Sequence, residues 1–214
     1  MPDEVVDIYD ENMTRTGTAL KSEAHRKGLW HRAIHCWVVR GPSPGAVLFQ
    51  KRGRSKAVYP NALDISAAGH YRAGETAREG VRELIEELGL AVPVEQLTPL
   101  GVKIDVGVFQ EHVVHEFCDV FLLRDDRAPR GYAPDPDEVD GLVGVGVPDG
   151  LALFSGERSE ASAQGIEYDH ASREWGAIRL SIDRGSVIPR VDPYYYKVMI
   201  LAERFLRGEK HLAI

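Results

Sequence analysis

The feature that most constrains this chain is the segment from Thr76 to Gly89, whose pattern is that of an amphipathic helix with one acidic side. Thr76 is expected to cap the helix, because Glu79 follows three residues later and completes a capping box. Gly89 is expected to end it, since glycine readily adopts the left-handed conformation. Four apolar side chains recur at helical spacing and predict a buried stripe: Ala77, Val81, Leu84 and Leu88.

The other side of this predicted helix carries carboxylates. At 100° per residue, Glu79, Glu83, Glu86 and Glu87 are expected to project from one face. Like charges four residues apart repel by about 0.2–0.5 kcal/mol per pair. A hard cation such as Mg²⁺ or Mn²⁺ would turn this repulsion into binding, with substrate phosphates filling its open positions. For the helix taken alone, a solvated acidic face without a task is the alternative.

Short β-rich runs surround this helix and predict a sheet covered by helices, an α/β fold with a mixed sheet. Residues 35–40 and 46–51 are expected to form a hairpin-like strand pair, and residues 63–66 a short strand before a turn at 67–69. Further strands are expected at 97–108, 113–123 and 142–147.

One domain over residues 1–214 is the simplest organisation, because the sequence contains no internal repeat. Within it we expect an N-terminal extension at 1–30, a candidate insertion at 155–174 and a C-terminal helix at 192–208. Asp192 is expected to cap that helix, with Pro193 at its first helical position.

Charge and composition narrow the class of protein. The net charge of −7 argues against a nucleic-acid partner, because such binding depends on lysine and arginine neutralising phosphates. No apolar run approaches the ~18–20 residues needed to cross a membrane, and the acidic start lacks a secretory pattern. Two cysteines are too few for a disulfide scaffold. We therefore expect a cytoplasmic protein without membrane contact, and a homodimer is left open.

Residues 69–90, GHYRAGETAREGVRELIEELGL, resemble the Nudix box, G-x5-E-x7-R-E-U-x-E-E-x-G-U, in which U is a bulky aliphatic residue. The matching positions are Gly69, Glu75, Arg82, Glu83, Leu84, Glu86, Glu87, Gly89 and Leu90. The resemblance implies a Nudix-type α/β/α sandwich. It also implies metal-dependent hydrolysis of a diphosphate linkage, in a nucleoside diphosphate derivative or another organic diphosphate.

One residue of the pattern is missing, because six residues rather than seven separate Glu75 from Arg82. A deletion inside a helix rotates what precedes it by about 100°. The Arg82–Leu90 half is intact, so the carboxylate face is expected to survive. In the family the glutamate at the position of Glu75 braces the arginine. Glu75 is expected to keep that role only if the loop before the helix accommodates the missing residue.

The resemblance also implies individual roles. Glu83 and Glu87 would bind Mg²⁺ or Mn²⁺, Glu86 would assist, and the Gly69 carbonyl would contribute. Arg82 would orient the carboxylates. The general base would be a helix glutamate, Glu83 or Glu86, or a glutamate outside the box.

Outside the box, the chain is similar to the branch of this family that contains isopentenyl-diphosphate isomerase, over residues 7–11, 25–39, 50–70 and 115–121. In that enzyme histidines and a glutamate hold a divalent metal, and the matching positions here are His31, His70 and Glu116, with His25 a looser match. The isomerase also needs an acid/base cysteine where this chain has Ala68. Isomerase chemistry is therefore an alternative that Ala68 disfavours.

Glu116 belongs to a predicted strand on which His112 and Val114 share its face. A buried glutamate needs a partner, which favours a second metal or a base role for Glu116. A zinc site from His112, His115 and Glu116 is disfavoured, because alternation places His115 on the opposite face.

The basic stretch 51–56 follows a strand and supplies candidates for the substrate diphosphate. Arg52 and Lys56 suit phosphate oxygens, and His70 in the box loop is a further candidate for substrate binding. A solvated basic loop is the alternative for the lysine and arginine. A non-catalytic module that binds a small-molecule diphosphate is the third functional hypothesis for the chain.

Overall fold

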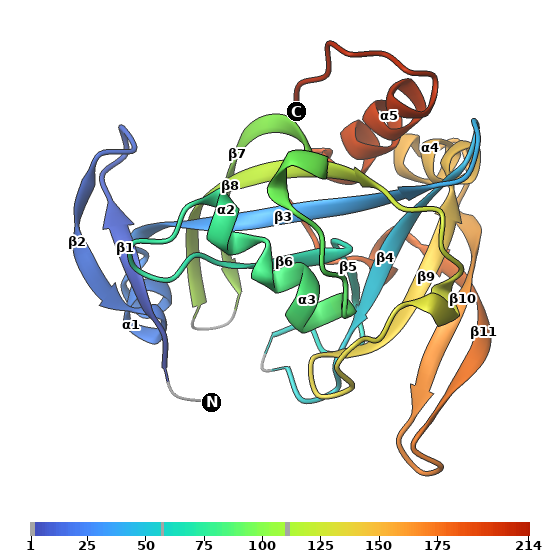
Figure 1. The fold of residues 1–214 in the computed structure, drawn as a ribbon, viewed down its shortest axis with the longest axis horizontal. Coiled ribbons are helices and arrows are strands. Elements are labelled where there is room, and N and C mark those ends of the chain that lie inside the picture. Colours follow the sequence, from blue (N-terminus) through green and yellow to red (C-terminus); the bar gives the residue numbers. More distant parts are fainter. Residues whose placement is uncertain (1–2, 57, 110–111) are drawn as a thin grey trace.

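The computed structural model describes residues 3–56, 58–109 and 112–214. Within these residues eleven strands form one sheet, whose main path runs β11-β10-β9-β4-β3-β1-β2 (Figure 1). Strand β8 lies parallel to β3, whereas the other neighbouring strands in the described residues pair antiparallel, so the predicted mixed sheet is confirmed. The strands are β1 (Val5–Tyr9), β2 (Arg15–Leu20), β3 (Trp30–Arg40), β4 (Ala46–Arg52), β5 (Leu63–Asp64), β6 (Ala67–His70), β7 (Thr98–Phe109), β8 (His112–Arg124), β9 (Val139–Gly146), β10 (Glu160–Asp169) and β11 (Glu174–Asp183).

Helices cover both faces of this sheet, which confirms the predicted α/β/α sandwich. They are α1 (Lys21–Lys27), α2 (Ala77–Gly80), α3 (Arg82–Leu88), α4 (Val147–Ser155) and α5 (Tyr194–Leu206). Alternate residues of β3 face the two layers: Val38 packs in the cluster that contains α3, and Val39 in the one that contains α4 and α5. None of the helices in the described residues is long and apolar enough to span a membrane.

The prediction of one continuous helix from residue 76 to 89 is wrong, because the helix breaks at Val81 (φ −62°, ψ −10°). Its two ends are as predicted: Thr76 and Glu79 form the capping box, and Gly89 is left-handed (φ 63°). Glu79 therefore serves the cap of α2 and does not join the carboxylates of α3. The prediction placed residues at 100° steps along one continuous helix, so it could not separate Glu79 from the α3 carboxylates.

Strands β3 and β4 pair only at their tips, at Val39–Val47 and Arg40–Ala46 in the described register. Below that point they diverge, and each takes a new neighbour. Strand β6 pairs with β3, and β5 pairs with β4. The turn predicted at 67–69 is therefore wrong, because these residues belong to β6. This divergence opens the sheet at the place where the candidate site residues lie.

The C-terminal third contains elements that the sequence did not reveal. Helix α4 and the β10–β11 hairpin occupy the polar region around the candidate insertion at 155–174, and α5 lies within 192–208. Pro193 is the N-cap of α5, so the predicted cap by Asp192 is wrong. The Asp192 carboxylate instead pairs with Lys197 at 3.0 Å. The assignment of 1–30 as an extension and of 155–174 as an insertion stays a prediction.

Candidate functional site

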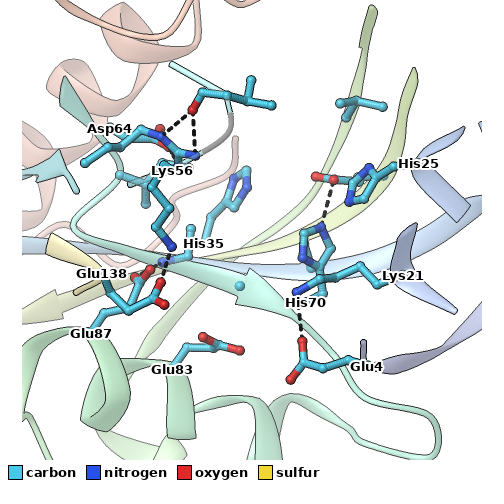
Figure 2. Close-up of a pocket in the computed structure, with 18 of the residues that line it drawn as sticks. Glu4, Lys21, His25, His35, Lys56, Asp64, His70, Glu83, Glu87 and Glu138 are labelled. Carbon is cyan, nitrogen blue, oxygen red and sulfur yellow. Dashed lines mark hydrogen bonds and ion pairs between the residues drawn. The ribbon is translucent and has the colours of Figure 1, made fainter. Parts of the chain in front are cut away.

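A cavity of about 990 Å³ lies where β3 and β4 diverge. Figure 2 shows Glu83 and Glu87 rising from α3 into it, with Lys56 on one side and His25 and His70 on the other. Most of the residues assigned a site role from the sequence line this cavity: His25, Arg52, Lys56, Gly69, His70, Glu83, Glu86, Glu87 and Glu116. The exceptions are His31, Glu75 and Arg82. The structure therefore brings the predicted site residues together.

Glu83 and Glu87 are buried carboxylates at the edge of β6. The Glu87 Oε2 atom accepts hydrogen bonds from the Ala68 backbone N–H (2.8 Å) and from Gln50 Nε2 (3.1 Å). Burial raises the pKa of Glu83 to about 7 and that of Glu87 to about 8. A bound cation would supply the charge compensation that these carboxylates need when ionised. Gln50 was not foreseen, because nothing in the sequence of β4 indicates a contact with α3.

Gly69 is required by the approach of Glu83. A Cβ atom at this position would lie 2.1 Å from Glu83 Cδ and 2.3 and 2.4 Å from the two carboxylate oxygens. The Glu83 carboxylate thus fills the space that a side chain would take, next to the backbone of β6. Two hard oxygen ligands and a nearby carbonyl suit Mg²⁺ or Mn²⁺.

Arg82 braces this arrangement from the side. Its guanidinium contacts the Glu75 carboxylate at 3.0 and 3.2 Å, the Glu83 carboxylate at 2.6 Å and the His70 carbonyl at 2.9 Å. It also donates to Glu86 at 3.0 Å, whose side chain is half exposed. Glu75 and Arg82 are therefore in contact although the segment between them is one residue short of the pattern.

A second group of metal-compatible side chains lies beside the same cavity, and three of its four members line it. His25, His31, His70 and Glu116 come from α1, β3, β6 and β8, and each offers a ligand atom within 4.8 Å of the others. Glu116 Oε1 lies 2.9 Å from His70 Nε2 and 3.5 Å from His31 Nε2. Burial lowers the pKa of His70, and that of His25 to about 3, so both imidazoles are neutral as metal ligands must be.

Two imidazole nitrogens of this group are buried without a hydrogen-bond partner among the residues that the structure describes. The His31 Nδ1 atom lies 2.8 Å from the Leu29 carbonyl, which can only accept, so Nδ1 carries the proton. In a neutral ring with that tautomer, Nε2 is an acceptor that faces the Glu116 carboxylate at 3.5 Å. In the described residues both His31 Nε2 and His25 Nδ1 are buried without a hydrogen-bond partner. A cation bound by these atoms would satisfy them, so the donor set fits a divalent metal.

His115 lies apart from this group, as strand alternation predicts. Its ring stacks on Trp30 at 4.8 Å between centroids, and its Nδ1 atom lies 2.7 Å from the Gly28 carbonyl. His112 stands on the cavity side, 5.8 Å from the ring of His25. The disfavoured zinc site from both histidines and Glu116 is thus incompatible with the observed placement of His115.

The cavity cations are paired with acids. Lys56 forms an ion pair with Glu138, and Arg52 lies 3.3 Å from Asp64. Two more cations, Lys21 and Arg72, line the opposite side, and the Glu4 carboxylate accepts from both at 2.9 Å. Sequence reasoning missed Lys21 and Arg72, since the fold of the N-terminal strands alone brings residue 21 beside the box loop.

Comparisons with known proteins agree with this geometry. Residues 29–152 match the family model described as the NUDIX domain. An uncharacterised Nudix hydrolase of Clostridium acetobutylicum is 32% identical over 201 residues, which cover 93% of this chain and 97% of that protein. An isopentenyl-diphosphate Delta-isomerase of Cereibacter sphaeroides is 34% identical over 167 residues, 75% of this chain and 89% of that protein. The crystal structure of DR0079 from Deinococcus radiodurans covers 72% of this chain and 90% of its own, with a TM-score of 0.53 and 25% identity.

Replacing Gly69 by alanine should displace the Glu83 carboxylate, because the new Cβ would overlap it. We expect affinity for Mg²⁺ or Mn²⁺, measured by calorimetry, to fall by at least ~10-fold, the scale of changes around a metal ligand. Gly176→Ala is the control, since Gly176 is also a strand glycine and a Cβ there would meet only the Glu167 carbonyl oxygen, at 4.0 Å. Equal affinities of the two variants would contradict the proposed role of Gly69.

The stability of the metal-free protein should fall with rising pH. Glu83 and Glu87 shift from a pKa of 4.5 to about 7 and about 8 on folding, so between these values the folded state binds more protons than the unfolded chain. The free energy of unfolding then decreases as pH rises through that interval. Thermal denaturation in a chelator should show this decline, and Glu87→Gln should reduce it. An identical pH dependence in both proteins would refute this explanation.

Proposed function

The chain belongs to the Nudix hydrolases, and from that premise we propose that it is a metal-dependent pyrophosphohydrolase that cleaves a diphosphate linkage in a small organic molecule. A nucleoside diphosphate derivative or another organic diphosphate is the proposed substrate class. The observation that carries the proposal is the burial of Glu83 and Glu87 at a glycine-edged strand, in a cavity that also contains Arg52 and Lys56.

Glu83, Glu87 and the Gly69 carbonyl would hold Mg²⁺ or Mn²⁺ in this proposal, with Glu86 assisting. A bound divalent cation would neutralise charge on the phosphate oxygens and lower the pKa of the attacking water. Arg82 keeps Glu83 and Glu86 in place through its guanidinium.

The protein side chains divide the remaining work. Lys56 would bind diphosphate oxygens in place of its present acidic partner Glu138, and Arg52 would bind them while it keeps its contact with Asp64. The base that removes a proton from water would be Glu86 or Glu83 on α3, or Glu116 across the cavity. His70 contacts Glu116 and would contact the substrate or its metal.

The proposed partner is a small-molecule diphosphate, with no nucleic acid or membrane. A cytoplasmic setting is part of the same proposal and is supported by the low cysteine content. A homodimer stays a prediction.

Glu87→Gln should abolish hydrolysis, because the amide keeps the shape of the side chain but removes the charge that holds a cation. We expect the rate of phosphate or monophosphate release from a panel of diphosphates with Mg²⁺ to fall by more than ~100-fold, beyond the effect of changing an outer partner of a ligand. Glu95→Gln is the control, since Glu95 is an exposed glutamate paired with Arg78. Unchanged turnover in Glu87→Gln, or tight binding of diphosphates without turnover in the parent protein, would contradict the proposal.

An isomerase acting on a five-carbon allylic diphosphate is a second candidate, favoured by the group of His25, His31, His70 and Glu116. Two observations weigh against it. Ala68 cannot transfer a proton. Both cysteines are fully buried, and burial raises the pKa of each thiol, so neither is suited to act in the cavity.

We expect no deuterium to enter isopentenyl diphosphate when the protein is incubated with it and with Mg²⁺ or Mn²⁺ in heavy water. The physical reason is that no thiol lines the described part of the cavity to exchange the allylic proton. Proton NMR of the diphosphate measures the exchange. Incorporation at a catalytic rate would replace the hydrolase proposal with the isomerase.

A further inference from the structure

A buried chain of alternating charges connects the C-terminal segment to the cavity wall. Arg190 lies between two carboxylates: its Nη2 atom is 2.9 Å from Asp64 Oδ1, and its Nη1 atom donates to Asp105 Oδ2. Asp64 in turn lies 3.3 Å from Arg52 Nη1. The side chains of Arg190, Asp64 and Asp105 are 9%, 6% and 4% exposed, so water screens these contacts little.

The row of alternating charges continues away from the cavity. Lys103 lies 3.0 Å from Asp105 and 3.4 Å from Asp192, just before α5. Positive and negative groups therefore alternate from Asp192 to Arg52 across segments that are distant in sequence. Arg190 is the central member of this row of charges. It lies outside residues 29–152, the part of the protein that matches the family model.

Arg52 stands at the cavity end of this chain. Its guanidinium is held by the Val58 carbonyl at 3.0 and 3.2 Å and by Asp64. Asp64 can hold Arg52 only if its own position is fixed, and Arg190 fixes it on the other side. A guanidinium can bridge two carboxylates through its planar fork, whereas a lysine ammonium acts as a point charge.

We infer that Arg190 is a positioning residue for diphosphate binding, which acts through Asp64 to orient the Arg52 guanidinium in the cavity. This inference rests on the proposed function, in which Arg52 contacts the diphosphate. Arg190 also lines the cavity, and in the described residues its buried Nε atom has no hydrogen-bond partner. Its two terminal nitrogens are nevertheless taken by Asp64 and Asp105, so the indirect role through Arg52 is the one the contacts support.

A double-mutant cycle with methylenediphosphonate as the ligand, in the presence of Mg²⁺, tests this inference. We expect Arg52→Ala to weaken binding in calorimetry by ~10-fold or more, the scale of a lost charge-assisted hydrogen bond. Arg190→Lys should weaken it by roughly 3- to 10-fold in the parent protein. In the Arg52→Ala background the same change should alter binding by less than about 2-fold, because coupled residues are not additive.

The kinetics supply a second readout that a general loss of structure would not reproduce. For any diphosphate that the protein hydrolyses, Arg190→Lys should raise KM and leave kcat within about 2-fold. Arg158→Lys is the control for the exchange itself, since Arg158 is exposed and pairs only with Asp149 among the described ion pairs. If Arg190→Lys does not fold, as its thermal transition would reveal, Asp64→Asn takes its place in the same cycle with the same expectations.

The outcomes separate the inference from the function on which it rests. If Arg52→Ala weakens binding but Arg190→Lys does not, or if the two effects add, the inference is overturned and the hydrolase proposal stands. If Arg52→Ala leaves binding unchanged, the inference falls together with the substrate-binding role of Arg52. Loss of hydrolysis in Glu87→Gln tests the proposed function independently of this chain of charges.

Discussion

The structure depends on two glutamate carboxylates buried against the edge of a strand. Desolvating a carboxylate is costly unless a proton, a cation or several hydrogen bonds compensate it. Glu87 obtains a backbone N–H from Ala68 and an amide from Gln50, and Glu83 obtains the guanidinium of Arg82. The raised pKa values indicate that these contacts do not fully compensate the charges. A divalent cation bound between Glu83 and Glu87 would compensate the remaining negative charge.

The fold provides the space for this arrangement by dividing its own sheet. Strands β3 and β4 separate below their tips, and β5 and β6 line the two sides of the opening. The carboxylates of α3 approach from one layer. The imidazoles and Glu116 come from α1, β3, β6 and β8. Arg52 and Lys56 come from β4 and the segment after it, and Lys21 and Arg72 from α1 and the loop after β6. Figure 2 shows acidic, imidazole and cationic side chains facing the same pocket. One cavity therefore combines hard oxygen ligands, nitrogen ligands and groups suited to phosphate.

Much of the helical part of the site could be predicted from local sequence. The capping box of Thr76 and Glu79, the left-handed Gly89 and the buried Leu84 and Leu88 all follow from spacing within a few residues. The break at Val81 could not be predicted, because helical periodicity alone does not report a local change of ψ. Arg82 contacts Glu75 although the segment between them is one residue short of the pattern.

By itself, the sequence determined which residue types lie at fixed helical spacing, and with them the α3 carboxylates and the left-handed glycine that ends α3. It did so because these relations are local, set by 3.6 residues per turn and by the conformational freedom of glycine. Only the tertiary structure decided that Gln50 reaches Glu87, and that Arg190 reaches Asp64 from the far end of the chain. Those contacts follow from strand register and from packing between layers, which couple residues far apart in sequence and leave no local pattern.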